Sequence, residues 1–180
     1  MARTRKKIIV TVSNDIVTDQ RMERICTSLS DMGFAVEIVG RKLKGSFPLI
    51  AKNYKQSRIK LGFIKGPLFY KELNLRLLFY LLAKKPDIVY SVDADTALAG
   101  VWAKKLIKSK LIFDAHELFS EVPELQNRGL IKRIWQGIEK LIILKADVRI
   151  TVSESVAKHY SSKYNKPFEV IRNKIGRAHV

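Results

Sequence analysis

The chain has 180 residues, of which 47% are apolar, and this composition is typical of a globular protein rather than a disordered one. Its 34 basic and 17 acidic residues give a formal charge of +17, which favours anionic partners such as nucleic acid, phosphorylated small molecules and anionic lipid. The basic N-terminus is followed by only a few apolar residues, and no stretch approaches the roughly 20 apolar residues of a membrane span. We therefore expect neither a signal peptide nor a spanning helix, and a cytoplasmic protein.

Short β-branched runs alternate along the chain with longer patterns of helical period. The strands that we expect cover residues 7–12, 35–40, 59–61, 88–91, 110–114, 148–152 and 168–171. Several of them are apolar on both faces, as parallel strands covered by helices must be. The helices that we expect cover residues 18–32, 69–84, 96–109, 130–144 and about 154–163. This alternation predicts an α/β fold, a Rossmann-like parallel sheet with helices on both faces.

Single residues indicate where the helices begin and which segments are exposed. Thr18, Asp95 and Ser153 have the side chains of N-caps and directly precede helical patterns. The pattern over residues 69–84 is apolar around most of its circumference, so we expect that helix to be well buried. The lysine-rich segment 41–57 interrupts the alternation and is expected to be an exposed loop.

Polar residues follow each expected strand, at the sheet edge where parallel α/β folds bind ligands. These residues are Ser13, Asn14, Asp15, Asp93, Asp95, His116, Glu117, Ser153, Glu154, Arg172 and Asn173. His116 lies between acids at a strand end, and a functional role and a structural hydrogen-bonding role are equally compatible with that position. Asp95 and Ser153 are first of all helix caps, and Asn14 and Asp15 also suit a turn.

Several familiar sites are missing from the sequence. The first strand is followed by VSNDIVTDQR instead of GxGxxG, which argues against a nicotinamide enzyme, and neither GxxxxGK[ST] nor GxSxG occurs. No pair of Cys or His residues has metal-ligand spacing, and the single cysteine, Cys26, falls on an apolar helical stripe as a core residue would. The lysines are scattered without a recognition-helix or aromatic-platform pattern, so we expect no specific nucleic acid partner.

Four segments together carry a family resemblance: IIVTVSNDIVTDQRMERICTSLSDMGFAVEIVGR, LIFDAHELFSEVPEL, IKRIWQGIEKLIILKADVRITVSES and VIRN. In order and spacing they resemble the N-terminal domain of family 4 glycosyltransferases of the GT-B fold, especially bacterial enzymes that build cell-surface polysaccharides or glycolipids. The resemblance covers nearly all of residues 1–173. It implies that this domain mainly binds the acceptor of a retaining transfer from a nucleotide-sugar donor to a glycan or lipid-linked acceptor. It also implies that no metal or other cofactor is needed.

The resemblance assigns roles to individual residues. His116 matches the histidine of the family's strand-end D-x-H-E pattern, which reaches the transferred sugar or the acceptor, and it is the expected catalytic residue. Asp19 and Arg21 match a recurrent D-x-R, with an ion-pair role or an acceptor-binding role. The first loop stands where the family often has a glycine-rich turn near the donor phosphates, but it lacks those glycines. The residues expected to bind substrate are Ser13, Asn14, Asp15, Arg21, Asp93, Asp95, Glu117, Arg172 and Asn173.

The resemblance also implies that the chain is incomplete. The family's C-terminal, donor-binding domain, with its glutamate pair eight positions apart, has no counterpart in the sequence, so we expect this fragment alone to be inactive. The last six residues, IGRAHV, are encoded by one frame of a common sequencing adapter, ATC GGA AGA GCA CAC GTC. We interpret residues 174–180 as translated adapter, with an ordinary basic tail as the alternative.

The basic charge is consistent with peripheral contact with the anionic inner membrane, where each Lys or Arg contributes about 1 kcal/mol. The candidates for this contact lie in the expected loop: Lys42, Lys44, Lys52 and Lys55, beside Phe47 and Tyr54. Two alternatives remain open. One is another GT-B enzyme, a nucleotide-sugar epimerase or a phosphorylase. The other is a non-catalytic basic module that binds nucleic acid or a membrane surface.

Overall fold

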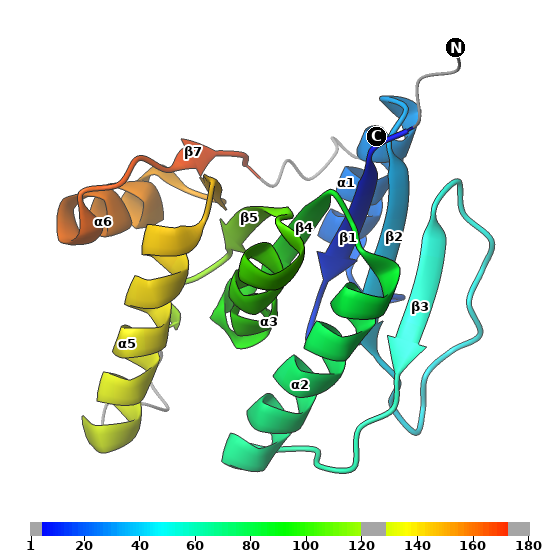
Figure 1. The fold of residues 1–180 in the computed structure, drawn as a ribbon, viewed down its shortest axis with the longest axis horizontal. Coiled ribbons are helices and arrows are strands. Elements are labelled where there is room, and N and C mark those ends of the chain that lie inside the picture. Colours follow the sequence, from blue (N-terminus) through cyan, green and yellow to red (C-terminus); the bar gives the residue numbers. More distant parts are fainter. Residues whose placement is uncertain (1–4, 120–128, 173–180) are drawn as a thin grey trace, which may run out of the picture.

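The computed structural model describes residues 5–119 and 129–172, and these ranges form one parallel α/β unit (Figure 1). The strands are β1 (Lys7–Thr11), β2 (Ala35–Arg41), β3 (Lys55–Ile59), β4 (Ile88–Val92), β5 (Lys110–Ala115), β6 (Val148–Thr151) and β7 (Glu169–Val170). The helices are α1 (Gln20–Asp31), α2 (Gly66–Lys84), α3 (Asp93–Ile107), α5 (Gly129–Lys145) and α6 (Glu154–Tyr164). Within the described ranges, no helix is both long enough and apolar enough to cross a membrane.

The strands lie in the order β3-β2-β1-β4-β5-β6-β7, and every neighbouring pair is parallel. Helix α1 lies on one face, and α2, α3 and α5 lie on the other (Figure 1). The predicted Rossmann-like sheet with helices on both faces is therefore confirmed. Because all the strands run in the same direction, their carboxyl ends meet along one edge of the sheet, as predicted from the sequence.

Each face of the sheet has its own apolar core. On the α1 side, Met22 and Cys26 are fully buried against residues of β1 and β2 such as Ile8 and Ile38. The prediction that Cys26 is a core residue is confirmed, and burial raises the pKa of its thiol to about 12. On the other side, Leu73 and Leu77 of α2 belong to the larger cluster that α3 and α5 complete.

Two of the three predicted helix caps are wrong. Helix α1 begins after Asp19, whose Oδ1 accepts a hydrogen bond from the Met22 amide at 3.0 Å, while the Thr18 hydroxyl donates to the Asp15 carbonyl. Helix α3 begins at Asp93, three residues earlier than a cap at Asp95 requires. The third prediction is confirmed, because Ser153 Oγ accepts from the Val156 amide at 3.4 Å.

The third strand lies earlier than residues 59–61, at β3, and only residues 42–54 form the loop before it. β3 is an edge strand with polar residues, and Ser57 Oγ donates to Glu37 Oε1 at 2.8 Å, so the apolar signal of the inner strands is missing. The expectation that the helix over residues 69–84 is well buried is also wrong for one face. Leu75 of α2 is 37% exposed and Phe79 is 66% exposed.

Candidate functional site

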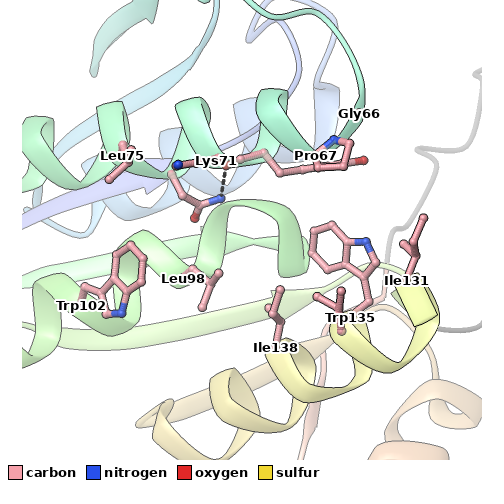
Figure 2. Close-up of a pocket in the computed structure, with 12 residues that line it drawn as sticks. Gly66, Pro67, Lys71, Leu75, Leu98, Trp102, Ile131, Trp135 and Ile138 are labelled. Carbon is pink, nitrogen blue, oxygen red and sulfur yellow. Dashed lines mark hydrogen bonds between the residues drawn. The ribbon is translucent and has the colours of Figure 1, made fainter.

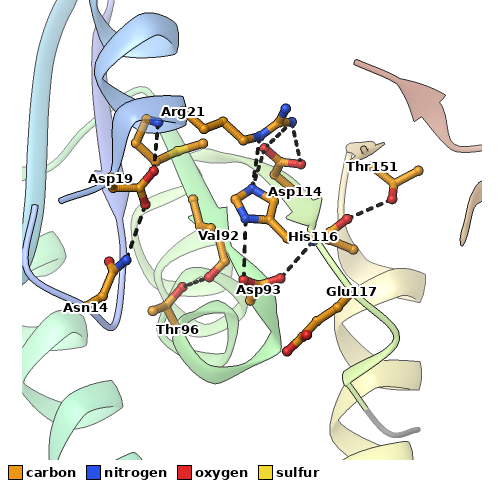
Figure 3. Close-up of polar contacts among 12 residues, drawn as sticks. Asn14, Asp19, Arg21, Val92, Asp93, Thr96, Asp114, His116, Glu117 and Thr151 are labelled. Atoms are coloured by element: carbon orange, nitrogen blue, oxygen red, sulfur yellow. Dashed lines mark hydrogen bonds and ion pairs between the residues drawn. The ribbon is translucent and has the colours of Figure 1, made fainter. Parts of the chain in front are cut away.

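The site centres on the end of β5, where residue alternation controls which side chains share a face of the sheet. Ala115 belongs to the core on the α2 side. Asp114 and His116, on either side of it in sequence, face the side of α1. Asp114 is fully buried and His116 is 25% exposed. The strand therefore places a buried carboxylate beside a partly exposed imidazole (Figure 3).

Arg21 of α1 contacts both Asp114 and His116. Its Nη2 lies 3.1 Å from Asp114 Oδ2, its Nε donates to His116 Nε2 at 3.1 Å, and its Nη1 donates to the Ile171 carbonyl at 3.0 Å. Tyr90 of β4 donates its hydroxyl to Asp114 Oδ2 at 2.7 Å. The Asp114 carboxylate is thus satisfied from two sides, as a buried charge must be.

Asp93 holds the other edge of the imidazole. Its Oδ1 accepts from the His116 amide at 2.8 Å, and its Oδ2 lies 3.7 Å from His116 Nδ1. In the neutral ring, the bond from Arg21 to Nε2 requires the proton to be on Nδ1, facing Asp93. When the ring gains a second proton, Nε2–H instead faces Asp114 Oδ2, 3.4 Å away. Both ring nitrogens therefore have a carboxylate within reach.

These neighbours change the proton affinity of the groups. Burial opposes a charge on His116, but the hydrogen bond to Asp114 and the negative charges of Asp93 and Asp114 outweigh it, so the pKa of His116 is raised. Burial likewise opposes ionisation of Asp114, yet the contacts from His116, Arg21 and Tyr90 lower its pKa. The site therefore favours an imidazolium beside a carboxylate.

The turn from β4 into α3 contributes two more carboxylates. Asp93 has a left-handed backbone with φ +56°, a conformation that Asp tolerates better than most residues and that turns its carboxylate toward His116. Burial raises the pKa of Asp93 to about 6. Asp95 is deeper, and burial together with the charge of Asp93 raises its pKa to about 7, although a hydrogen bond from Ser13 opposes this.

A polar cleft of about 440 Å³ opens beside this cluster. It is lined by Asn14, Thr18, Asp19, Gln20, Arg21, Arg24 and His116, which come from the first loop, from α1 and from the end of β5. Asn14 Nδ2 donates to Asp19 Oδ2 at 3.5 Å. The hydroxyl, amide and guanidinium groups that line the cleft suit a polar, anionic or sugar ligand rather than an apolar one.

The structure brings together most of the residues predicted for the site, but not all of them. Asn14, Arg21, Asp93 and His116 meet at or near the cleft, Ser13 directly precedes Asn14 in the first loop, and Asp95 is buried in the first turn of α3. Asp15 is buried in an ion pair with Arg58, whose Nη2 lies 2.8 Å from Asp15 Oδ1.

The remaining predicted residues stand apart from the cluster. Glu117 has an exposed side chain, and Arg172 pairs with Glu154 at 3.5 Å on the surface. Asn173 lies outside the described residues.

Sequence reasoning missed two members of the cluster, Tyr90 and Asp114. Asp114 was visible as the first residue of the D-x-H-E pattern, two positions from His116 and hence on the same face of the strand. Tyr90 was visible as a residue with a polar tip in an otherwise apolar strand, where a buried hydroxyl needs a partner. In residues 5–119 and 129–172, no group of three or more His, Cys, Asp or Glu side chains could hold a metal ion.

Comparison with known proteins identifies the family. The sequence profile of Glycosyltransferase Family 4 matches residues 19–175, which is most of the chain. The chain belongs to this glycosyltransferase family. No curated protein sequence matches it.

Solved structures agree on the fold. Sucrose-phosphate synthase from Thermosynechococcus elongatus superposes with a TM-score of 0.74 at 15% identity, over 95% of this chain and 49% of that one. The lipopolysaccharide outer core galactosyltransferase WaaB superposes with a TM-score of 0.63 at 12% identity, over 97% of this chain and 47% of that one. The UDP-GlcNAc 2-epimerase from Methanocaldococcus jannaschii superposes with a TM-score of 0.59 at 16% identity, over 93% of this chain and 45% of that one. At these identities the likeness concerns the fold, and the chain spans about half the length of each of these proteins.

Proposed function

We propose that this chain is the acceptor-binding half of a retaining glycosyltransferase that moves a hexosyl group from a nucleotide-sugar donor to a glycan or lipid-linked acceptor. Membership of the family supports the transferase activity, and the coverage of about half of each neighbour supports a second domain in cis. The similarity to WaaB, which acts in the lipopolysaccharide outer core, favours bacterial cell-surface polysaccharide or glycolipid synthesis on the cytoplasmic side of the membrane.

The observation that carries the proposal is His116 held between Asp93 and Asp114 with Arg21 on its edge, at the rim of the polar cleft. In an imidazolium there, Nε2–H faces Asp114, whereas Nδ1 is 3.7 Å from Asp93 Oδ2, beyond hydrogen-bond distance, so Nδ1–H could donate to a sugar hydroxyl or to the phosphate that departs with the nucleotide. A retaining transfer by front-face attack requires no protein nucleophile. It depends instead on positioning and on stabilisation of the leaving phosphate, which fixed charges supply. In this proposal no cofactor beyond the donor takes part.

The remaining cleft residues would position the acceptor. Asn14 and Arg21 line the cleft on the α1 side, and Asp93 faces it from the start of α3. Asp95 is buried and would support this rim without touching the sugar. Because the first loop contains no glycine, we propose that the donor diphosphate is held mainly by the second domain and not by this loop.

The epimerase alternative has a specific observation in its favour, because UDP-GlcNAc 2-epimerases are among the structural neighbours. It predicts a different product from the same donor. An epimerase converts the nucleotide sugar without an acceptor, whereas a transferase releases the nucleoside diphosphate only when an acceptor takes the sugar.

The test is an assay of the full-length protein with a panel of nucleotide sugars, with and without a lipid-linked or glycan acceptor. We expect acceptor-dependent release of nucleoside diphosphate and retention of the anomeric configuration in the product. An epimerised donor in the absence of acceptor, or an inverted linkage, would contradict the proposal.

A further inference from the structure

Helices α2, α3 and α5 enclose an apolar groove of about 550 Å³ on the face of the sheet opposite α1 (Figure 2). Leu98 and Trp102 of α3 and Ile138 of α5 line it, and Trp135 lies at its α5 end. Trp135 packs edge-on against Tyr70 and at a tilt against Phe119, with 4.9 and 4.6 Å between ring centroids. The groove is thus a built, aromatic-walled channel that the catalytic cluster does not use.

The surface around the groove is also apolar. The exposed large side chains on the three helices are Leu68, Leu75, Phe79, Trp102, Leu106, Leu130, Ile134, Leu141 and Leu144. Three of them, Phe79, Leu106 and Leu130, are 60% to 74% exposed. Leu75 and Phe79 of α2, and Trp102 and Leu106 of α3, are each four residues apart and so share a helix face with the groove lining. Apolar surface that clusters in this way marks an interaction site rather than ordinary exposure of single residues.

The most exposed charges on the same helices are all positive. Every exposed charged residue of α2, α3 and α5 is a cation: Lys71, Arg76, Lys84, Lys105, Arg133, Lys140 and Lys145. Two of these cations have an acidic neighbour, since Arg76 Nε pairs with Glu72 Oε1 at 2.8 Å and Lys84 Nζ lies 3.9 Å from Glu37 Oε1. The acidic residues of the helices are less exposed than these cations. Glu139 is buried and bonded to Tyr160, and Glu72 caps the Gly62 and Phe63 amides. Two copies of this surface would repel each other electrostatically. An anionic lipid surface would bind both its apolar side chains and its cations.

We propose that this surface docks the protein on an anionic bilayer, with one acyl or isoprenoid chain in the groove and lipid phosphates on the surrounding cations. The aromatic side chains at the groove, Trp102 and Trp135, are the types that gather at membrane interfaces. We assign the contact to α2, α3 and α5 because the groove there can admit a lipid chain. The loop 42–54 also exposes apolar side chains, Phe47 and Ile50 at 71% each, and it is the alternative contact that the loop control below tests.

The groove also has a structural connection to the cleft. Asn74, which lines the groove, donates from Nδ2 to the Asp95 carbonyl at 2.6 Å and accepts at Oδ1 from the Ala99 amide at 3.0 Å. The groove wall is therefore bonded to the turn that carries Asp93. In this proposal, the head group of a lipid whose chain lies in the groove would be directed toward the sheet edge where His116 stands. The identity of this lipid as the acceptor rests on the proposed function, whereas the bilayer contact does not.

The test is sedimentation of the full-length protein with vesicles of phosphatidylcholine alone and of phosphatidylcholine with phosphatidylglycerol. Two pairs of substitutions on the groove surface are compared, Trp102→Gln with Ile134→Gln, and Lys71→Gln with Arg133→Gln. All four side chains are at the surface, so the fold should be retained, which circular dichroism checks. The matched control is Lys42→Gln with Lys44→Gln and Phe47→Gln in the loop 42–54.

We expect binding only to the anionic vesicles, a loss of roughly tenfold or more in affinity for each groove pair, and little change for the loop control. Equal binding to both kinds of vesicle, unchanged binding by the groove variants, or a loss confined to the loop control would overturn the inference. So would an absence of vesicle binding by the folded full-length protein, which would mean that other parts of the chain cover the groove. Transfer to a water-soluble acceptor distinguishes the two proposals. If it persists without vesicle binding, only this inference fails, and if no acceptor is used, the proposed function fails.

Discussion

Arg21 of α1 and Asp114 of β5 form an ion pair with Nη2 and Oδ2 3.1 Å apart and side chains only 8% and 0% exposed. The two residues are 93 positions apart in sequence, so the pair joins the first helix to the middle of the sheet. Arg21 also bonds to His116 and to the Ile171 carbonyl. The pair therefore determines where the imidazole stands relative to the cleft.

Removing one partner of this ion pair should destabilise the folded protein. Arg21→Ala leaves the Asp114 carboxylate buried without its cation, and we expect the free energy of unfolding to fall by about 3–5 kcal/mol in urea denaturation. The double substitution Arg21→Ala with Asp114→Asn should recover part of that loss, because the uncompensated charge is gone. The control is Arg172→Ala, which breaks a pair with 68% and 70% exposed side chains and should have no measurable effect. Equal stability of Arg21→Ala and wild type would contradict this account.

The raised pKa of Asp95 predicts that its substitution by Asn stabilises the fold in a pH-dependent way. Its pKa is raised from 3.8 to about 7 in the folded protein, so its ionised form opposes folding above about pH 7 and the penalty disappears as the pH falls toward 4. Asp95→Asn should therefore raise the melting temperature more at pH 8 than at pH 5. Asp147→Asn is the control of opposite sign. The contact with Lys104 and other cations lowers the pKa of Asp147 despite burial, so that substitution should destabilise at pH 7 and lose its effect in acid. A gain for Asp95→Asn that is independent of pH would refute the assignment.

Gly40 of β2 lets the first loop pack against the sheet. A Cβ at this position would lie 2.7 Å from the Asn14 carbonyl oxygen and 2.6 Å from Ile16 Cγ2. Gly40→Ala should therefore displace the loop that carries Asn14 and lower the free energy of unfolding by about 1–3 kcal/mol. Gly45→Ala, where nothing lies within 4 Å of the added Cβ, is the matched control and should be close to wild type. The outcome that contradicts this prediction is the same urea midpoint for both variants.

The interpretation of residues 174–180 as translated adapter can be tested on the DNA itself. We expect the gene, sequenced through codon 173, to continue in frame into a second βαβ domain with a glutamate pair eight positions apart. A stop codon directly after Val180 would instead favour a freestanding basic domain, and with it the alternative of a non-catalytic binding module.

Much of the fold could be predicted because the inner strands have simple patterns. The strands around IIV and LIF are buried on both faces, so their apolar runs identified them, and the helices between them required a parallel sheet. The edge strand β3 was misplaced because KQSRI has one exposed side and little apolar signal. The apolar face of α2 was taken for core because sequence periodicity does not distinguish a surface that meets a partner from one that meets the protein interior.

For the site, the sequence predicted only the edge of the sheet at which it lies. Strand order along the chain brought His116, Asp93 and Ser13 to one side, since parallel strands share their carboxyl ends. The partners of each residue depended on contacts between distant segments. Asp15 pairs with Arg58, 43 residues away, and Tyr90 reaches Asp114 from the neighbouring strand. Neither pairing leaves a mark in the local sequence.

The central claim is that His116 acts in sugar transfer, and the most direct measurement is kcat and KM of full-length His116→Ala with its nucleotide sugar and acceptor. We expect kcat to fall by about 10²-fold or more with an unchanged circular dichroism spectrum, because the proposed imidazolium contact with a sugar hydroxyl or the leaving phosphate is lost. The raised pKa of His116 also predicts that wild-type activity declines as the pH rises through a value above 6.5, and that this step is absent from the variant. Near-normal turnover by folded His116→Ala, with the same pH profile as wild type, would show that His116 is only a structural hydrogen-bonding residue.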